Sequence, residues 1–110
     1  IAGGIGITPL KAMAETLAAR GAAFQLHYTG RAPQEMAFVN DLRRHFPDRC
    51  RFYFTQAPTP NRLDVPALLN GTSADTVIYV CGPARLSESV RQTAGRLGSA
   101  DERVQFESFI

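Results

Sequence analysis

Ile1-Ala2-Gly3-Gly4-Ile5-Gly6-Ile7-Thr8-Pro9 is the stretch that decides the fold of this chain. An apolar start runs into three glycines, and a threonine and a proline then lead into a helical pattern. This order is typical of a strand, a turn that holds a phosphate group and the first turn of a helix. Glycine lets the backbone approach an anion closely, and the free N–H groups of a helix start attract that anion. We therefore expect phosphate binding by Gly3, Gly4, Gly6, Thr8 and Pro9.

Two of these residues carry a more specific expectation. A side chain at Gly6 is expected to occupy the space that a pyrophosphate needs. The hydroxyl of Thr8 is expected either to cap the helix or to donate to the phosphate.

A second stretch, Tyr79-Val80-Cys81-Gly82-Pro83, repeats the order of apolar strand, glycine and proline before a helix. Between and around the two motifs, strand-like and helix-like patterns alternate. We expect helices over about 9–20, 33–45, 64–69 and 83–97. We expect strands at the N-terminus and over 24–29, 51–55, 76–81 and 103–109. Phe38 and Leu97 are predicted on the buried sides of their helices, and the apolar row from Val77 to Val80 predicts a strand buried on both faces.

The alternation predicts an α/β fold, a doubly wound, Rossmann-like parallel sheet of five strands in the order 3-2-1-4-5 with helices on both faces. Ligands of such sheets bind at the carboxyl ends of the strands, where the winding reverses. The glycine turn follows strand one and the Cys81-Gly82-Pro83 turn follows strand four. The order therefore predicts that the two motifs meet at one nucleotide-binding crevice.

Composition restricts the other possibilities. A net charge of +2 with scattered arginines does not indicate nucleic-acid binding, and no apolar run has the length of a membrane span. Two cysteines without metal-ligand spacing indicate a reducing compartment, so a cytoplasmic protein is expected. Residues 1–110 are read as one domain. Only Ile1 and Ala2 precede the glycines, whereas a useful strand has about five residues, so we expect a fragment of a longer protein.

The glycine turn differs from two common nucleotide motifs. The usual dinucleotide fingerprint has a further glycine three residues after the second and an acidic residue about twenty positions on. This chain has Ile7, Thr8 and Pro9 after Gly6, and Tyr28-Thr29-Gly30-Arg31 where the acid is expected. No Gly-Lys-Ser/Thr follows the glycines either. Neither a dehydrogenase of the usual Rossmann type nor a P-loop protein is therefore expected.

The two motifs, with His27-Tyr28, Ala37-Phe38 and the tail Val104-Gln105-Phe106-Glu107-Ser108-Phe109, resemble the NAD(P)H-binding domain of the ferredoxin–NADP reductase superfamily. The branch is that of phthalate dioxygenase reductase and the vanillate O-demethylase reductases, and the resemblance covers essentially the whole chain. It implies a flavoprotein oxidoreductase in which this module delivers hydride from NADH, or NADPH, to a flavin, FMN or FAD, held by a neighbouring domain. Electron transfer would continue through the 2Fe–2S centre of a ferredoxin domain to a terminal oxygenase or demethylase.

Neither the flavin domain nor the ferredoxin domain lies in this sequence, and two cysteines cannot hold a cluster that needs four. The chain alone is therefore expected to be inactive as a reductase. A nucleotide-binding regulatory module without a redox role is the alternative.

The resemblance implies roles for residues of the second motif and the tail. The thiol of Cys81 would lie beside the nicotinamide C4, with Gly82 and Pro83 binding the cofactor; the alternative is an ordinary buried cysteine. Glu107 would lie near the nicotinamide amide and Phe109 would stack near the flavin, or both would be plain strand residues. A nucleophilic Cys81 would need a nearby base, and neither histidine has a pattern that brings it close.

Arg31 follows strand two, where the adenosine ribose is expected. It would contact a 2′-phosphate or stack on adenine, or else point into solvent.

Overall fold

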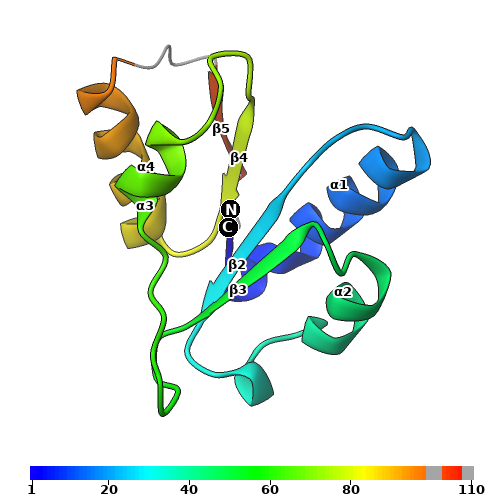
Figure 1. Cartoon of the computed structure of the whole chain (residues 1–110). Coiled ribbons are helices and arrows are strands. Elements are labelled where there is room, and N and C mark those ends of the chain that lie inside the picture. The colour runs from blue at the N-terminus through cyan, green and yellow to red at the C-terminus, as the bar shows by residue number, and fades with distance from the viewer. Residues whose placement is uncertain (99–102, 108–110) are drawn as a thin grey trace.

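The computed structural model describes residues 1–98 and 103–107 and contains a five-stranded parallel sheet (Figure 1). The strand order β3-β2-β1-β4-β5 is the predicted one. The strands are β1 (Ala2–Gly3), β2 (Leu26–Gly30), β3 (Cys50–Phe54), β4 (Ile78–Cys81) and β5 (Val104–Glu107). The helices are α1 (Ile7–Ala19), α2 (Val39–His45), α3 (Val65–Asn70) and α4 (Ala84–Arg96).

The helices cover both faces of the sheet, as predicted, and each face has its own core. Figure 1 shows α1 and α2 on one side of the sheet and α3 and α4 on the other. Ala2, Tyr28 and Cys81 face the first pair and pack with apolar residues such as Leu10 and Leu42. The second core contains Ile1, Val65, Leu69, Ile78, Val80, Val90, Ala94 and Val104.

Strand β1 is short but central. Ala2 pairs with Tyr28 on β2 and with Cys81 on β4, and Gly3 pairs with Thr29. The neighbouring pair β2–β3 is longer and runs in register from Leu26 to Gly30. Two residues therefore join the β2–β3 half of the sheet to the β4–β5 half.

The helix predicted over 33–45 is broken, which corrects the prediction for Phe38. Pro33–Glu35 form a 3-10 turn, and α2 begins only at Val39. Phe38 between them has a left-handed backbone with φ 66°, which helical residues do not adopt. Its side chain is 41% exposed and lies 5.0 Å from the ammonium of Lys11 rather than in the core.

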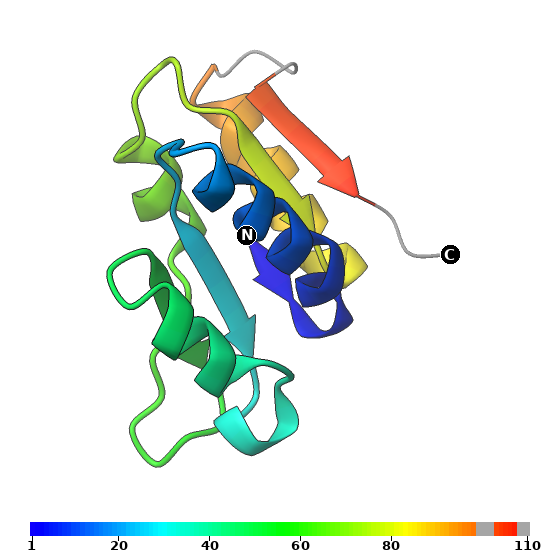
Figure 2. The ribbon, with the colours of Figure 1, turned by 90° about the vertical axis from the view of Figure 1, so that its right-hand side faces the viewer.

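Strand β4 is not buried on both faces. Ile78 and Val80 lie in the second core, but Val77 is 51% and Tyr79 38% exposed. Their side of the sheet faces α1, and Figure 2 shows that α1 lies over β1 while β4 and β5 extend beyond it. Leu97 is also exposed, because α4 ends at Arg96 and Leu97 is its C-cap. These apolar side chains were predicted to be buried, and the structure leaves them open.

Candidate functional site

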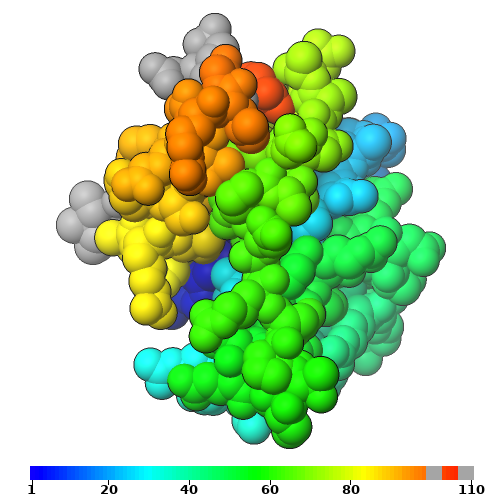
Figure 3. Space-filling view, turned by 60° about the vertical axis from the view of Figure 1, so that its left-hand side comes forward, coloured from blue at the N-terminus to red at the C-terminus, as the bar shows by residue number. Residues whose placement is uncertain are grey.

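The two predicted motifs meet at the carboxyl ends of β1 and β4. In the space-filling view, a recess lies there with the blue N-terminal segment as its floor (Figure 3). The yellow start of α4 borders it on one side, and the cyan and green segments after β2 and β3 border it on the other. We call this recess the crevice. Its position is the switch point at which open α/β sheets bind their ligands.

The glycine turn ends in an open helix start. Gly4–Gly6 form a 3-10 turn and α1 begins at Ile7, two residues earlier than predicted. The N-cap is Gly6, no side chain caps the helix and no acidic residue lies in its first turn. Thr8 is therefore not the cap, and it is exposed within the first turn together with the half-buried Pro9. An uncapped helix start without a carboxylate is suited to an anion.

Gly4 is the glycine of the turn that faces open space. Its φ is +54°, a conformation that side chains rarely adopt, and a Cβ added there would meet no atom within 4 Å. The next residue, Ile5, is 73% exposed. Sequence reasoning missed Ile5, although an apolar residue between two glycines of a turn is a signal that something covers it.

From the sequence, a side chain at Gly6 was expected to enter the space of a pyrophosphate. In the structure, it would instead meet the second motif. A Cβ at Gly6 would overlap the carbonyl oxygen of Cys81 and lie 2.9 Å from the nitrogen of Gly82. The Cβ direction of Gly6 is therefore filled by the backbone of the second motif, so a side chain there would collide with the chain itself. Similarly, a Cβ at Gly82 would lie 3.1 Å from the Cα of Gly3. The two turns therefore contact each other backbone to backbone, and we call this contact between Gly3–Gly6 and Cys81–Pro83 the joint.

Gly3 and Pro83 complete this joint. A Cβ at Gly3 would lie 3.0 Å from the Cδ of Pro83 and 2.8 Å from the Cδ2 of Leu86. Pro83 is the N-cap residue of α4 and offers no side-chain cap. The starts of α1 and α4 therefore approach each other closely at the crevice, because Gly3, Gly6 and Gly82 have no side chains that would separate them.

Cys81 lies in the core next to the crevice. It is 1% exposed and packs in the cluster that contains Ala2, Ile7 and Leu10, where α1 crosses the sheet. Its backbone N–H donates to the carbonyl of Ile1 at 3.0 Å. The geometry therefore agrees with a buried strand-end cysteine. The two histidines lie elsewhere: the ring of His27 bonds Tyr53 and Gln25, and His45 is exposed at the end of α2.

Arg31 and the backbone of Glu107 also lie at the carboxyl end of the sheet. Arg31 directly follows β2, is exposed, and its carbonyl accepts from the backbone N–H of Gln56 at 2.8 Å. A Cβ at the preceding Gly30 would lie 2.6 Å from the sulfur of Met36, so that glycine makes room for packing. The backbone of Glu107 ends β5 in register with Cys81. Phe109 lies outside the described residues.

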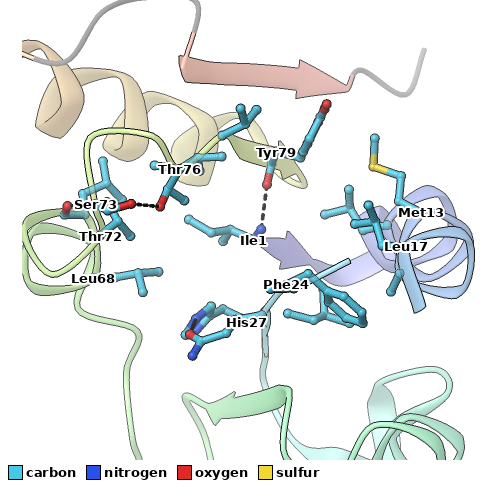
Figure 4. Close-up of a pocket in the computed structure, with 18 of the residues that line it drawn as sticks. Ile1, Met13, Leu17, Phe24, His27, Leu68, Thr72, Ser73, Thr76 and Tyr79 are labelled. Atoms are coloured by element: carbon cyan, nitrogen blue, oxygen red, sulfur yellow. Dashed lines mark hydrogen bonds between the residues drawn. The ribbon is translucent and has the colours of Figure 1, made fainter. Parts of the chain in front are cut away.

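A separate hollow, shown in Figure 4, is not part of this site. It measures about 860 Å³ and lies at the amino ends of β2 and β4, and none of the predicted site residues lines it. His27 borders it, with its Nδ1 2.9 Å from the hydroxyl of Tyr53. Burial, the nearby N-terminal ammonium and Arg51 lower the pKa of His27 to about 4. A neutral ring there suits packing rather than acid–base chemistry at neutral pH.

Metal ligation and membrane insertion are two further possibilities for residues 1–98 and 103–107. No group of three His, Cys, Asp or Glu side chains in this part of the chain could hold a metal ion. In the same part, every helix is too short or too polar to cross a membrane.

Comparison with known proteins agrees with the geometry. The family model described as "Oxidoreductase NAD-binding domain" matches residues 1–92. A vanillate O-demethylase oxidoreductase of Pseudomonas sp. strain HR199 is 44% identical over 109 residues, which are 98% of this chain and 34% of that protein. A carnitine monooxygenase reductase subunit of Escherichia coli strain K12 is 38% identical over 109 residues, 99% of this chain and 34% of that protein. The chain thus spans about a third of the length of these relatives.

The fold has a solved counterpart as well. Phthalate dioxygenase reductase superposes with a TM-score of 0.85 at 31% identity, covering 97% of this chain and 33% of that one. The resemblance inferred from the glycine turn and the Cys81-Gly82-Pro83 turn is confirmed by these matches. With a family model matched over residues 1–92 and the predicted fold in place, this chain belongs to the family of oxidoreductase NAD-binding domains.

Proposed function

We propose that this chain is the NADH-binding module of a flavin-dependent oxygenase reductase. The observation that carries the proposal is the joint between the two turns, which brings an open helix start and the end of β4 together at one crevice. Relatives named as reductases of a demethylase and a monooxygenase support the class of reaction.

The pyrophosphate of the cofactor fits the glycine turn. Gly4 offers a backbone with open space around it. The N–H of Ile7 bonds the carbonyls of Gly4 and Ile5, so the N–H groups proposed to bind the phosphate are those of the Gly4–Gly6 turn, at the positive dipole end of α1 and without a competing side-chain cap. The exposed hydroxyl of Thr8 adds a donor in the first helical turn. Gly3 and Gly6 act indirectly, because they allow the second turn to come close enough to complete the crevice.

Different residues of the protein are proposed to contact the two ends of the cofactor. The nicotinamide end lies toward Cys81, Gly82 and Pro83, with Glu107 at the end of the adjoining strand. The adenosine end lies toward Arg31, which follows β2 and is exposed. When bound, NADH supplies a hydride from C4 of its nicotinamide ring. The protein contributes binding and orientation, so the backbone of the Cys81-Gly82 turn would set the position of the ring.

The hydride acceptor is proposed to be a flavin, FMN or FAD, on a neighbouring domain of the same polypeptide. A ferredoxin domain with a 2Fe–2S centre and a terminal oxygenase would follow as electron carriers, with Phe109 near the flavin. This part of the proposal is supported by relatives about three times as long as this chain. The chain alone should bind NADH and show no diaphorase activity.

Titration of the ¹⁵N-labelled chain with NADH tests the binding site directly. We expect the largest amide shifts at Gly4, Ile5, Thr8 and Gly82. The Thr8→Val variant should weaken binding about three- to tenfold, the usual value of one hydrogen bond. Thr16→Val is the matched control, because Thr16 lies on the same helix and its hydroxyl bonds the carbonyl of Ala12.

A titration with NADPH then tests the adenosine end. We expect NADH to bind at least as tightly as NADPH. If Arg31 instead contacts a 2′-phosphate, Arg31→Gln will weaken NADPH binding more than NADH binding. Amide shifts confined to residues around the hollow at the amino ends of β2 and β4, or no amide shifts at millimolar NADH, would contradict the proposed site.

A further inference from the structure

Within the described chain, strand β3 is the outermost strand on its side of the sheet, so one of its edges faces away from β2. The N–H of Thr55, directly after β3, donates to the carbonyl of Gly30 at 2.9 Å, so the backbone of Thr55 faces β2. Because the backbone groups of successive residues in a strand point in opposite directions, those of Phe52 and Phe54 face the outer edge. Polar groups at such an edge need other partners.

Asn61 supplies these partners. Its Oδ1 accepts from the N–H of Phe54 at 3.0 Å, and its Nδ2 donates to the carbonyl of Phe52 at 2.9 Å. The backbone N–H of Asn61 also donates to the carbonyl of Phe54 at 3.2 Å. A parallel neighbouring strand accepts from one residue and donates to the residue two positions earlier in the same way. The side-chain amide of Asn61 therefore takes the place of a peptide group of a further strand.

The bonds of Asn61 close the loop that follows β3, residues 55–60, which we call the 55–60 loop. At its start, Thr55 and Gln56 bond the backbone that continues β2. Residues 57–60 make no hydrogen bond to the rest of the described chain. Pro58 and Pro60 restrict this stretch, because the proline ring fixes φ. The arrangement of the loop therefore depends on its short backbone and on the three bonds of Asn61 at its far end.

The 55–60 loop lies at the crevice. The backbone N–H of Gln56 donates to the carbonyl of Arg31 at 2.8 Å, which joins the loop to the residue that follows β2. Figure 3 shows the green segment after β3 beside the cyan segment after β2 at the border of the crevice. Gln56, Pro58, Thr59 and Pro60 are exposed. The loop therefore presents an uncharged surface next to Arg31, where the adenosine end of NADH is proposed to lie.

We propose that Asn61 is a positioning residue for the adenosine end of the cofactor. Its amide holds the 55–60 loop in the arrangement that, together with Arg31, forms one wall of the crevice. This inference rests on the proposed function, which supplies the cofactor. Asn61 acts through the loop and does not contact the cofactor. Because the loop is already ordered before binding, NADH does not lose affinity by having to order it.

The test compares Asn61→Ala with the wild-type chain for two ligands, NADH and reduced nicotinamide mononucleotide, which lacks the adenosine half. NMR titration of the ¹⁵N-labelled chains gives both dissociation constants. If the loop without the amide has its binding arrangement for about a tenth of the time, the apparent Kd for NADH rises about tenfold. The Kd for the mononucleotide should stay within about twofold, because a ligand that does not contact the loop has the same affinity for both arrangements.

Two further variants separate this role from a loss of folding. Asn61→Asp has nearly the same shape and keeps the acceptor for the N–H of Phe54, but it lacks the donor to the carbonyl of Phe52. It should therefore also weaken the binding of NADH and not that of the mononucleotide. Asn70→Ala is the matched control, because Asn70 is an exposed asparagine at the end of α3. It should leave both dissociation constants unchanged.

The order of the loop is measured without nucleotide. The heteronuclear NOE values of Gln56, Ala57 and Thr59 should fall in Asn61→Ala, and unchanged values would overturn the proposal. Wild-type dissociation constants in Asn61→Ala, or an equal loss of affinity for both ligands, would overturn the role of Asn61 and leave the proposed function intact. A wild-type chain that does not bind NADH would overturn the proposed function and this role with it, and the NOE values would then show only whether Asn61 orders the loop.

Discussion

The Cα of Gly6 faces the carbonyl of Cys81 across the joint between the two turns. From the sequence, Gly6 looks like a residue that makes room for a ligand, because glycine-rich turns before helices often hold phosphate. In the structure, the atoms that it makes room for belong to the chain itself, 75 residues further on. The residue that leaves space toward the outside is Gly4.

Substitution of Gly6 should therefore affect folding before it affects binding. Gly6→Ala forces a Cβ into the backbone of Cys81 and Gly82, and overpacking of this kind costs about 1–3 kcal/mol or more. Gly95→Ala is the matched control, because Gly95 lies within α4 with nothing within 4 Å of an added Cβ. That change should stabilise the chain by about 0.5–1 kcal/mol, the helix preference of alanine over glycine. Urea unfolding measures both, and an undisturbed Gly6→Ala would contradict the contact.

The two cysteines offer a pair for testing the role of Cys81. Both are buried, Cys50 on β3 and Cys81 at the crevice, so each alanine variant should lose about 1–2 kcal/mol of stability from a small cavity. In a reductase that carries this module, Cys81→Ala alone should also slow flavin reduction by saturating NADH about tenfold, equivalent to about 1.4 kcal/mol of barrier. Stopped-flow spectroscopy decides this. Equal rates in the two variants would make Cys81 a core residue only.

At the level of elements, the N-cap of α3 depends only on residues that are close together in the sequence. Asp64 precedes the helix, and its Oδ1 accepts from the backbone N–H of Ala67 at 3.0 Å. Asp64→Ala should lower the free energy of unfolding by about 1 kcal/mol, the usual value of an N-cap. Asp64→Asn should retain most of it, because asparagine caps equally well. Thermal unfolding of the three forms checks this, and a neutral alanine variant would show that packing alone holds α3.

Other elements show where local signals are insufficient. The apolar spacing of 33–45 predicts one helix, but the left-handed Phe38 divides it, and its ring lies 5.0 Å from the ammonium of Lys11 on another helix. The apolar run in β4 predicts burial on both sides, but burial of Val77 and Tyr79 depends on what lies beside β1. Both errors come from tertiary contacts that periodicity does not encode.

For the whole molecule, alternation of strands and helices is sufficient to predict the topology, because few connections are compatible with right-handed crossovers. The same topology predicts that the Gly3–Gly6 turn and Cys81 meet, and they do. It does not predict atomic contacts at the joint, the burial of the Cys81 thiol or the open helix start at Gly6, since these depend on packing within a few ångströms.

Global stability should depend on pH through two buried basic groups that are neutral in the folded chain at neutral pH. The pKa of His27 is lowered to about 4 and that of the Ile1 ammonium to about 5, both mainly by burial. Between these values and the ordinary values of 6.5 and 8.0, the unfolded chain binds more protons than the folded chain. Stability should therefore rise with pH from about 4 to 8.

His27→Gln isolates the contribution of the ring. It should flatten the profile between pH 4 and 6.5 by about 1–2 kcal/mol, less than the full shift would give because the ring is partly solvated. His45→Gln, at an exposed position, is the control. Urea unfolding at pH 4.5, 6 and 7.5 measures the slope, and parallel profiles for the wild type and His27→Gln would contradict the assignment.

The pairing of Ala2 with Cys81 has a consequence for the order of folding. Strand β1 can pair with β2 soon after both are synthesised, but its second partner is synthesised almost 80 residues later. Closing so long a loop is entropically costly, and contacts of this kind form late in folding. A nascent chain that has not yet reached β4 therefore has a glycine turn but no crevice. Nucleotide binding becomes possible only once α4 begins to form, which makes it a marker for completion of the fold.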